Sequence, residues 1–313
     1  MQNNQKIIAI FGGGGFLGKH LMRQLTKLDY RVKVATRNPY LKGYLKPLGN
    51  PGQIELFKTN IFCTDEVKQI LKNYDFVINL VGILYETRKQ KFNQIHAQFP
   101  HLLSNLCNEL EIKNLVHISA LGVKEGHVSK YMQSKLQGEK NIQDTFRSSV
   151  ILRPSVCFGP DDKFFNTFAS IAQFSPILPL VGGGKTKFAP VYVGDVAKAI
   201  IKVLELNNLK PKIYELGGPE NYSFRKLMEI LLVEIKKKRF LIPIPFGVAK
   251  FQSYFLQMMN NPLLTPDQVE MLRYNNIVSG EHPTLKDLGI SGKTIQSILP
   301  QYIYRFRAGG QFG

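Results

Sequence analysis

Apolar residues in the first half of the chain alternate between short continuous runs and longer stretches with helical spacing. The short runs predict buried strands at residues 6–11, 31–36, 54–59, 76–81, 114–119 and 150–154. The helical patterns follow the first run and cover residues 93–110 and 129–145. Strands that alternate with helices are typical of a parallel sheet covered on both faces. The sequence therefore predicts an α/β fold with a doubly wound parallel sheet and a ligand at the carboxyl ends of its strands.

The pattern changes after residue 155, where prolines divide the chain into shorter pieces. We predict two domains, residues 1–155 and a smaller lobe at 156–313. A helix at 193–206 and a strand at 212–216 indicate that about 190–218 of this second part returns to the sheet.

Three glycines spaced three apart connect the first predicted strand to the first predicted helix. Gly12 would allow a sharp turn, Gly15 would let the backbone approach a pyrophosphate, and Gly18 would let the helix pack on the sheet. The phosphates would lie at the helix N-terminus, where free N–H groups favour anions. Four consecutive glycines can also form a plain turn, but the flanking strand and helix favour a dinucleotide site in a Rossmann-like domain.

Three Tyr/Lys pairs have the spacing that places both side chains on one helix face. Tyr131 and Lys135 lie near the start of the helix after the fifth strand, where they would reach the carboxyl edge of the sheet. There the ammonium would lower the pKa of the phenol and hold a ribose hydroxyl. Solvated helix residues are the alternative for this pair. The other two, Tyr85/Lys89 and Tyr222/Lys226, are interpreted as chance.

The cysteine and histidine content and the net charge limit the classes of function that the chain can have. Three scattered cysteines favour a reducing compartment without disulfides, and the histidines show no metal-ligand spacing, so no metal site is expected. The net charge of +18 suits nucleic acid, an anionic membrane surface or an acidic protein, or simply reflects composition. Because no nucleic-acid recognition motif is present, we expect no nucleic acid partner.

No apolar stretch is long enough to span a bilayer, and because the first predicted strand begins at about residue 6 we expect no targeting peptide. Residues 246–259 carry an apolar stripe at helical spacing, with basic residues nearby. Such a stripe usually belongs to the core. We favour that interpretation over a docking surface for a membrane or partner.

The chain resembles the atypical and extended short-chain dehydrogenase/reductases. More narrowly, it resembles the bacterial form of the family of the 39 kDa accessory subunit of respiratory complex I. The resemblance runs nearly end to end, on the glycine motif, the Tyr131/Lys135 pair and segments at 79–84, 117–122, 152–162, 190–196, 214–219 and 299–307.

The resemblance implies where a cofactor binds. It assigns the three glycines to the pyrophosphate, Tyr131 and Lys135 to the nicotinamide ribose, and residues 79–82 to the nicotinamide side. The full cofactor set that we expect is Gly12, Gly15, Phe16, Leu17, Gly18, Arg37, Asn60, Val81, Gly82, Tyr131, Lys135 and Pro154.

The end of the second strand bears on which dinucleotide binds. NAD sites usually place a carboxylate there for the ribose 2′-hydroxyl, whereas this chain has Thr36 followed by Arg37. A guanidinium suits a 2′-phosphate. We therefore expect NADPH, with NAD(H) as the alternative if Arg37 only covers the adenine.

One departure from active relatives concerns catalysis. They commonly carry a Ser or Thr just past the fifth strand that binds the reacting carbonyl, and here Ala120 aligns with it. Ser119 replaces that hydroxyl only if the register shifts by one. The catalytic candidates are thus Tyr131 and Lys135, with Ser119 as the alternative.

Two functions follow from the resemblance. The first is an accessory or assembly protein with a structural NADPH, docked on subunits of respiratory NADH:quinone oxidoreductase (complex I) or on an anionic membrane surface. It would be cytoplasmic and peripheral on a bacterial inner membrane, or on the matrix side if organellar. The alternative is an NADPH-dependent reductase or epimerase for a small carbonyl or sugar-like substrate, with quinone metabolism as one setting. Ala120 and the basic charge favour the first.

Overall fold

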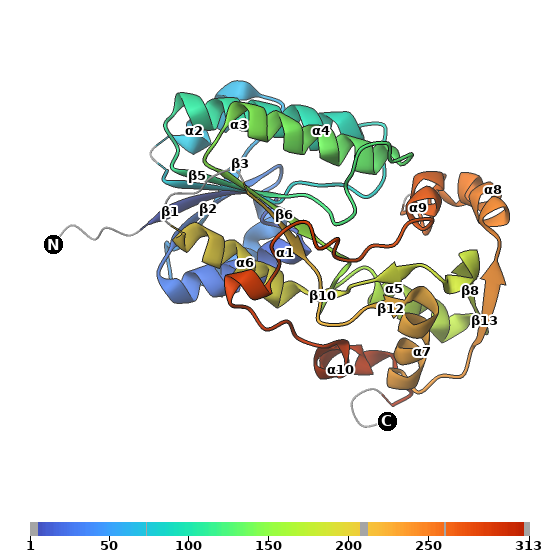
Figure 1. Cartoon of the computed structure of the whole chain (residues 1–313). Helices are drawn as coiled ribbons and strands as arrows, with labels where there is room; N and C mark the ends of the chain where they lie inside the picture. The colour runs from blue at the N-terminus through green and yellow to red at the C-terminus, as the bar shows by residue number, and fades with distance from the viewer. Residues whose placement is uncertain (1–5, 73, 207–211, 260, 310–313) are drawn as a thin grey trace.

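The computed structural model describes residues 6–72, 74–206, 212–259 and 261–309 (Figure 1). Its centre is a parallel sheet of seven strands in the order β11-β6-β5-β4-β1-β2-β3. The strands are β1 (Ile7–Phe11), β2 (Arg31–Thr36), β3 (Ile54–Lys58), β4 (Phe76–Asn79), β5 (Asn114–Ile118), β6 (Ser149–Pro154) and β11 (Lys212–Leu216). The order reverses between β1 and β4, which is where ligands bind in doubly wound sheets. The predicted fold class is confirmed.

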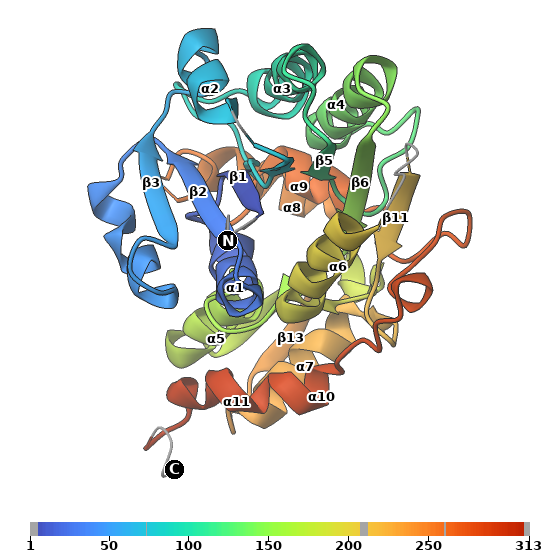
Figure 2. The same cartoon turned by 90° about the vertical axis from the view of Figure 1, so that its left-hand side faces the viewer.

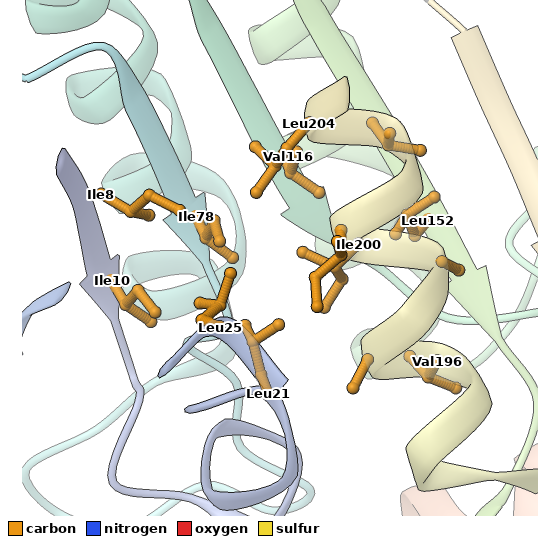
Figure 3. Close-up of a cluster of buried hydrophobic side chains, with 14 of the residues drawn as sticks. Ile8, Ile10, Leu21, Leu25, Ile78, Val116, Leu152, Val196, Ile200 and Leu204 are labelled. Atoms are coloured by element: carbon orange, nitrogen blue, oxygen red, sulfur yellow. The ribbon is translucent and has the colours of Figure 1, made fainter. Parts of the chain in front are cut away.

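Helices cover both faces of this sheet (Figure 2). One face carries α2 (Thr64–Leu71), α3 (Phe99–Glu109) and α4 (Lys130–Thr145), and the other carries α1 (Phe16–Leu25) and α6 (Val193–Glu205). Figure 3 shows the core beneath α1 and α6, where Ile10 and Leu152 of the strands face Leu21 and Ile200 of the helices. Buried aliphatic side chains pack the helices onto both faces of the sheet. This packing holds the strands in place, and with them the edge formed by their carboxyl ends.

The predicted elements of this layer differ from the structure mainly at their ends. The fourth strand ends at Asn79 instead of residue 81, because the Asn79 side chain binds the Val81 N–H and turns the chain out of the sheet. The helical stretch from 93 opens with a π-helical turn, Gln94–Gln98, before α3. Short 3₁₀ segments follow α1 (Thr26–Leu28) and β2 (Tyr40–Leu48).

The second half of the chain adds a lobe with its own core. Its longer elements are α5 (Phe165–Phe174), β8 (Ile177–Val181), α7 (Phe224–Glu234), β13 (Phe240–Ile244), α8 (Phe246–Leu256) and α9 (Pro266–Met271). Strand β8 pairs with β13, and the two-residue strands pair as β7 (Cys157–Phe158) with β10 (Val191–Tyr192) and β9 (Lys187–Phe188) with β12 (Tyr222–Ser223). Near the C-terminus lie 3₁₀ turns at Lys286–Leu288 and Tyr304–Phe306 and the short helices α10 (Ile295–Ile298) and α11 (Pro300–Ile303). Phenylalanines and leucines of α5, β8 and α7 form a cluster separate from the core under the sheet.

The apolar stripe at 246–259 does not belong to the core, so the interpretation favoured from sequence is wrong. Helix α8 buries only Ala249 and Ser253, against α9. The stripe residues are 48% to 81% exposed: Val248, Phe251, Phe255, Met258 and Met259. Helical spacing shows that one face is apolar but not which face is covered, and here the small residues face inward. Among the described residues, no helix is both long and apolar enough to cross a membrane.

Helix α4 lies close to the π-helical turn at one glycine. A Cβ atom on Gly138 would lie 1.8 Å from the carbonyl oxygen of His96, which is too close for any side chain. This contact sets the distance between α4 and the segment that carries His96. The helices on this face therefore depend on a glycine inside α4, where glycine is otherwise unfavourable.

We predict that Gly138→Ala lowers the free energy of unfolding by about 1–3 kcal/mol, because α4 must move away from the π-helical turn. Gly247→Ala in α8 is the control, since nothing lies within 4 Å of its Cβ position. That substitution should be neutral or stabilise the protein by up to about 1 kcal/mol. Urea unfolding measures both. Equal effects of the two substitutions would contradict the packing described here.

Candidate functional site

The loop between β1 and α1 requires glycine at its first position for two reasons. Gly12 has a φ of +78°, in the left-handed region that disfavours other residues. A Cβ atom there would also lie 2.8 Å from the carbonyl carbon of Leu80 and 2.9 Å from the nitrogen of Val81. The loop between β1 and α1, called the glycine loop below, therefore packs closely against the residues that follow β4.

The N-terminus of α1 has the features of an anion site. Gly15 is its N-cap and supplies no capping side chain, and the first turn, which begins with Phe16 and Leu17, contains no acidic residue. A Cβ atom on Gly15 would contact only the carbonyl oxygen of Gly12, at 3.3 Å, so the space beside Gly15 is otherwise open. Free N–H groups here would donate hydrogen bonds to a phosphate.

Gly18 serves a different contact from the one expected. A Cβ atom on Gly18 would lie 2.0 Å from the carbonyl oxygen of Gly13, so this glycine lets α1 pack on its own glycine loop instead of on the sheet. Glycine is therefore needed at this position, but the atom that leaves no room for a side chain belongs to the glycine loop and not to the sheet.

The end of β2 presents cations beside the glycine loop. Arg37 is exposed, and within the described ranges its guanidinium forms no hydrogen bond or ion pair. Lys42 Nζ and the Tyr44 hydroxyl donate to the Gly14 carbonyl oxygen over 3.1 and 3.0 Å. Sequence analysis did not find Lys42 and Tyr44, because no helical or strand spacing marks the 3₁₀ segment that carries them. Asn60 follows β3, and its side-chain oxygen accepts the Phe62 N–H.

Beyond β4, two buried polar side chains shape the loop that faces α4. Asn79 accepts the Val81 N–H at 3.0 Å, and its amide donates to Nδ1 of His117 at 3.1 Å. Gly82 follows, and a Cβ atom on it would lie 3.5 Å from Nζ of Lys135 and 3.7 Å from Nε2 of His96. The structure therefore brings Gly82 and Lys135 together across the edge of the sheet.

His96 connects this loop to α4, and sequence analysis did not identify it. Its Nε2 accepts the Ile83 N–H at 3.0 Å, which leaves the proton on Nδ1 to be donated to Ser134 Oγ, also at 3.0 Å. Ser134 Oγ in turn donates to the Tyr131 carbonyl oxygen. Burial, followed by the charge of Lys135, lowers the pKa of His96 to about 2, so the imidazole is neutral. No sequence pattern marks this contact, because its partners come from separate elements.

Lys135 is a buried cation under the loop. Its Nζ donates to the carbonyl oxygen of Ile118 at 3.0 Å. Burial lowers the pKa of Lys135 to about 8, and Glu139 opposes that shift. Glu139 binds Arg153 through two hydrogen bonds of 3.0 and 2.5 Å, and Arg153 also lies 4.0 Å from Glu215. At neutral pH the ammonium remains mostly charged.

Tyr131 lies four residues before this lysine on α4, but its pKa does not shift as expected from sequence. Burial raises the pKa of its phenol, with Cys157 and Asp267 adding to the shift, whereas we predicted that Lys135 would lower it. The reason is packing: the ring lies against Phe92 and His96. Within the described residues the hydroxyl has no hydrogen-bond partner, and it stays protonated at neutral pH.

The two residues after β5 lie in different surroundings. Ala120 packs against the apolar cluster that contains Tyr131 and Phe92. Ser119 is buried, and its Oγ, like Nε2 of His117, has no partner among the described residues. An alanine therefore packs against the cluster that contains Tyr131, at the position where a carbonyl-binding hydroxyl would otherwise be expected.

The second lobe also holds Tyr131 in place, through a residue that sequence analysis missed. Asp267, in the first turn of α9, accepts the Ser129 hydroxyl at 2.8 Å and the N–H groups of Lys130 and Tyr131 at 2.7 and 3.2 Å. These bonds cap α4 with a carboxylate that lies 136 to 138 residues further along the chain. Pro154, at the end of β6, accepts the Leu121 N–H at 2.9 Å.

The remaining candidates lie elsewhere. Tyr85 binds Asn261, while Tyr222 binds Glu220 and Lys226 pairs with Glu229, so neither of these Tyr/Lys pairs is joined to the cluster around Lys135. Within the described ranges, no group of three or more His, Cys, Asp or Glu side chains is arranged to hold a metal ion.

Comparison with known proteins agrees with this geometry. Residues 8–217 match the model of the NAD dependent epimerase/dehydratase family, which is more than half of the chain. The chain belongs to this family. Its fold matches dTDP-glucose 4,6-dehydratase from Streptomyces venezuelae, solved with NAD and TYD bound, with a TM-score of 0.72, 18% identity and 96% of each chain covered.

Within the family, the chain is most informatively compared with subunits of respiratory complex I. It is 30% identical to NADH dehydrogenase (ubiquinone) 1 alpha subcomplex subunit 9 of Arabidopsis thaliana, over 97% of this chain and 79% of that protein. It is 24% identical to the NADH-ubiquinone oxidoreductase 40 kDa subunit of Neurospora crassa, over 97% and 80%. The resemblance noted from sequence is confirmed.

We predict that Glu139→Ala lowers the free energy of unfolding by about 3 kcal/mol or more, because it leaves the buried Arg153 guanidinium without its main carboxylate. Glu125→Ala is the matched control, since Glu125 pairs with Lys140 on the surface. That change should leave stability within experimental error. Thermal and urea unfolding measure both variants, and a Glu139→Ala protein as stable as the control would contradict the role of the buried pair.

Proposed function

We propose that the chain binds a nicotinamide dinucleotide across the edge where β1 and β4 diverge. The pyrophosphate would lie at the N-terminus of α1, against Gly12, Gly15 and Gly18. Lys135 and Tyr131 would bind the nicotinamide ribose beside Gly82. The open side of Gly15 and the close approach of Lys135 to Gly82 support this placement. The remaining cofactor residues would be Phe16, Leu17, Arg37, Asn60, Val81 and Pro154.

NADPH is the proposed dinucleotide. Arg37 is exposed at the end of β2 and forms no bond within the described ranges, so its guanidinium is available to a 2′-phosphate. Lys42 lies nearby on the Gly14 carbonyl oxygen and adds positive charge. A carboxylate, which would favour NAD(H), does not follow Thr36.

In this proposal the protein is an accessory or assembly factor of respiratory NADH:quinone oxidoreductase, and the nucleotide is structural. When bound, NADPH can supply a hydride, but the surroundings of Tyr131 favour binding of the nucleotide without catalytic turnover of a substrate. The observation that carries this point is Ala120, which occupies the position where active relatives carry a carbonyl-binding hydroxyl and packs against the cluster that contains the buried, protonated Tyr131 phenol. The relatives named as complex I subunits point to the partner. The protein would then lie at the cytoplasmic face of a bacterial inner membrane, or at the matrix face in an organelle.

The alternative is an NADPH-dependent reductase or epimerase for a small carbonyl or sugar-like substrate. The Tyr131 hydroxyl, which has no partner among the described residues, favours it, because such a phenol can donate a proton to a substrate. Lys135 would be needed for ribose binding in either case. A test of the Tyr131 hydroxyl therefore distinguishes the two functions.

We expect tighter binding of NADPH than of NADH, measured by titration calorimetry on the purified protein. Arg37→Asp should reverse or abolish the preference, since it places a negative charge against the phosphate. Lys27→Asp, an exposed change in the 3₁₀ turn after α1, is a control for total charge. Equal affinities of the wild type for the two nucleotides would overturn the assignment.

For the biological role, we expect Tyr131→Phe to leave respiratory NADH oxidation largely intact, while Gly15→Asp abolishes the contribution of this protein. The phenol is worth at most one hydrogen bond to the ligand, about 0.5–1.5 kcal/mol. An aspartate at the N-cap position is compatible with the fold, because Gly15 has ordinary dihedrals and its Cβ meets only the Gly12 oxygen. Its carboxylate would still occupy the phosphate site.

Cells that carry each variant provide the measurement, with the melting temperature and NADPH affinity of the purified proteins recorded alongside. The decisive contrary result is a Tyr131→Phe protein that folds and binds NADPH normally but no longer supports the phenotype. That result would replace the accessory role with the enzyme.

A further inference from the structure

One face of the second lobe exposes large apolar side chains from consecutive elements. Strand β13 runs directly into α8 through Pro245, and both lie on the side of the molecule opposite to β1 (Figure 1). We call this surface the α8–β13 face. Its members are 41% to 81% exposed: Phe240, Ile242, Val248, Phe251, Tyr254, Phe255, Met258, Met259 and Leu263.

The orientation of α8 is fixed by the small residues that it buries. Ala249 and Ser253 face α9, so Phe251 points directly away from the lobe, with Tyr254 and Phe255 to either side. The rings of Phe251 and Phe255 are 5.3 Å apart. An amphipathic helix in a soluble domain would turn these rings inward.

The start of α8 is anchored, so the outward rings are held by the fold. The Phe246 ring fills the space beside Gly182, where a Cβ atom would lie 2.3 Å from it. The Arg273 guanidinium lies 4.7 Å from the centre of the same ring. Lys250 Nζ binds Glu270 of α9 at 2.7 Å. These contacts hold the α8–β13 face in place against the rest of the second lobe.

The segment that carries this face supplies only positive charges, of which Lys250 is paired with Glu270 of α9. Residues 235–266 contain Lys236, Lys237, Lys238, Arg239 and Lys250 and no Asp or Glu. The basic run directly precedes Phe240, the first residue of β13. Aromatic and methionine side chains next to lysines match a surface that is apolar inside and anionic at its boundary.

We propose that the α8–β13 face binds an anionic lipid bilayer, with Phe251 and Phe255 entering the headgroup–acyl boundary and the 236–239 run at the phosphates. This inference rests on the proposed function and extends it, because it adds a contact with lipid to the contact with the protein partner. A docked subunit of a membrane enzyme would then touch both the enzyme and the surrounding lipid. The site for the dinucleotide lies in the other lobe and does not contribute to this face.

The test is co-sedimentation of the purified full-length protein with vesicles of phosphatidylcholine, with and without phosphatidylglycerol. We expect binding to the anionic vesicles that weakens as salt is raised. Phe251→Ser/Phe255→Ser should lower the partition coefficient at least about tenfold, and Lys237→Ala/Lys238→Ala roughly tenfold. Leu28→Ser/Leu206→Ser, which removes two exposed leucines of the first lobe, should change nothing. Circular dichroism and the melting temperature check that all variants fold.

Three results would overturn the proposal. The first is no sedimentation of the wild type with anionic vesicles. The second is a wild-type dimer, seen by light scattering, that the Phe251→Ser/Phe255→Ser variant loses while vesicle binding is unchanged, which would assign the face to a second copy. The third is loss of respiratory subunits from the purified variant without any effect on vesicle binding, which would assign it to a protein. Vesicle binding by a protein that captures no respiratory subunit would instead leave this inference standing and remove the proposed function.

Discussion

The candidate site depends on the burial of one ammonium group. Lys135 lies under the sheet edge, where removing a charge from water is costly unless other groups compensate. The Ile118 carbonyl oxygen accepts one of its protons, and Glu139 favours its charged form. Both neighbouring imidazoles stay neutral, because burial and this cation lower the pKa values of His96 and His117. A positive charge is thereby maintained next to Gly82.

Helix α4 holds this arrangement together because the loop after β4, the π-helical turn and the second lobe are each fixed to it. His96 ties the loop after β4 to Ser134, and the glycine at 138 sets how closely that segment approaches. Asp267 caps the same helix from the second lobe. Helix α9, which carries Asp267, also supports α8. The lipid-facing surface that we propose and the nucleotide site thus share one structural element, although they lie in different lobes.

Much of the first lobe could be predicted from sequence because its strands are continuous apolar runs and its helices have clear periodicity. The second lobe could not, since β8 and β13 pair across more than sixty residues and no local pattern marks that partnership. The outward face of α8 was misjudged for the same reason. At the site, spacing selected the glycines and the Tyr131/Lys135 pair as candidates, and their roles stay predictions. The roles of His96, Glu139 and Asp267 depend on contacts between distant segments, and the pKa of Tyr131 depends on burial.

The central claim is that this chain holds NADPH as a structural ligand while attached to a respiratory enzyme. Affinity purification from native membranes in mild detergent tests it most directly, with co-purifying proteins and the released nucleotide both identified by mass spectrometry. The account predicts subunits of NADH:quinone oxidoreductase together with NADPH in an amount close to that of the chain. A protein recovered without those subunits, or with them but free of nucleotide, would contradict it.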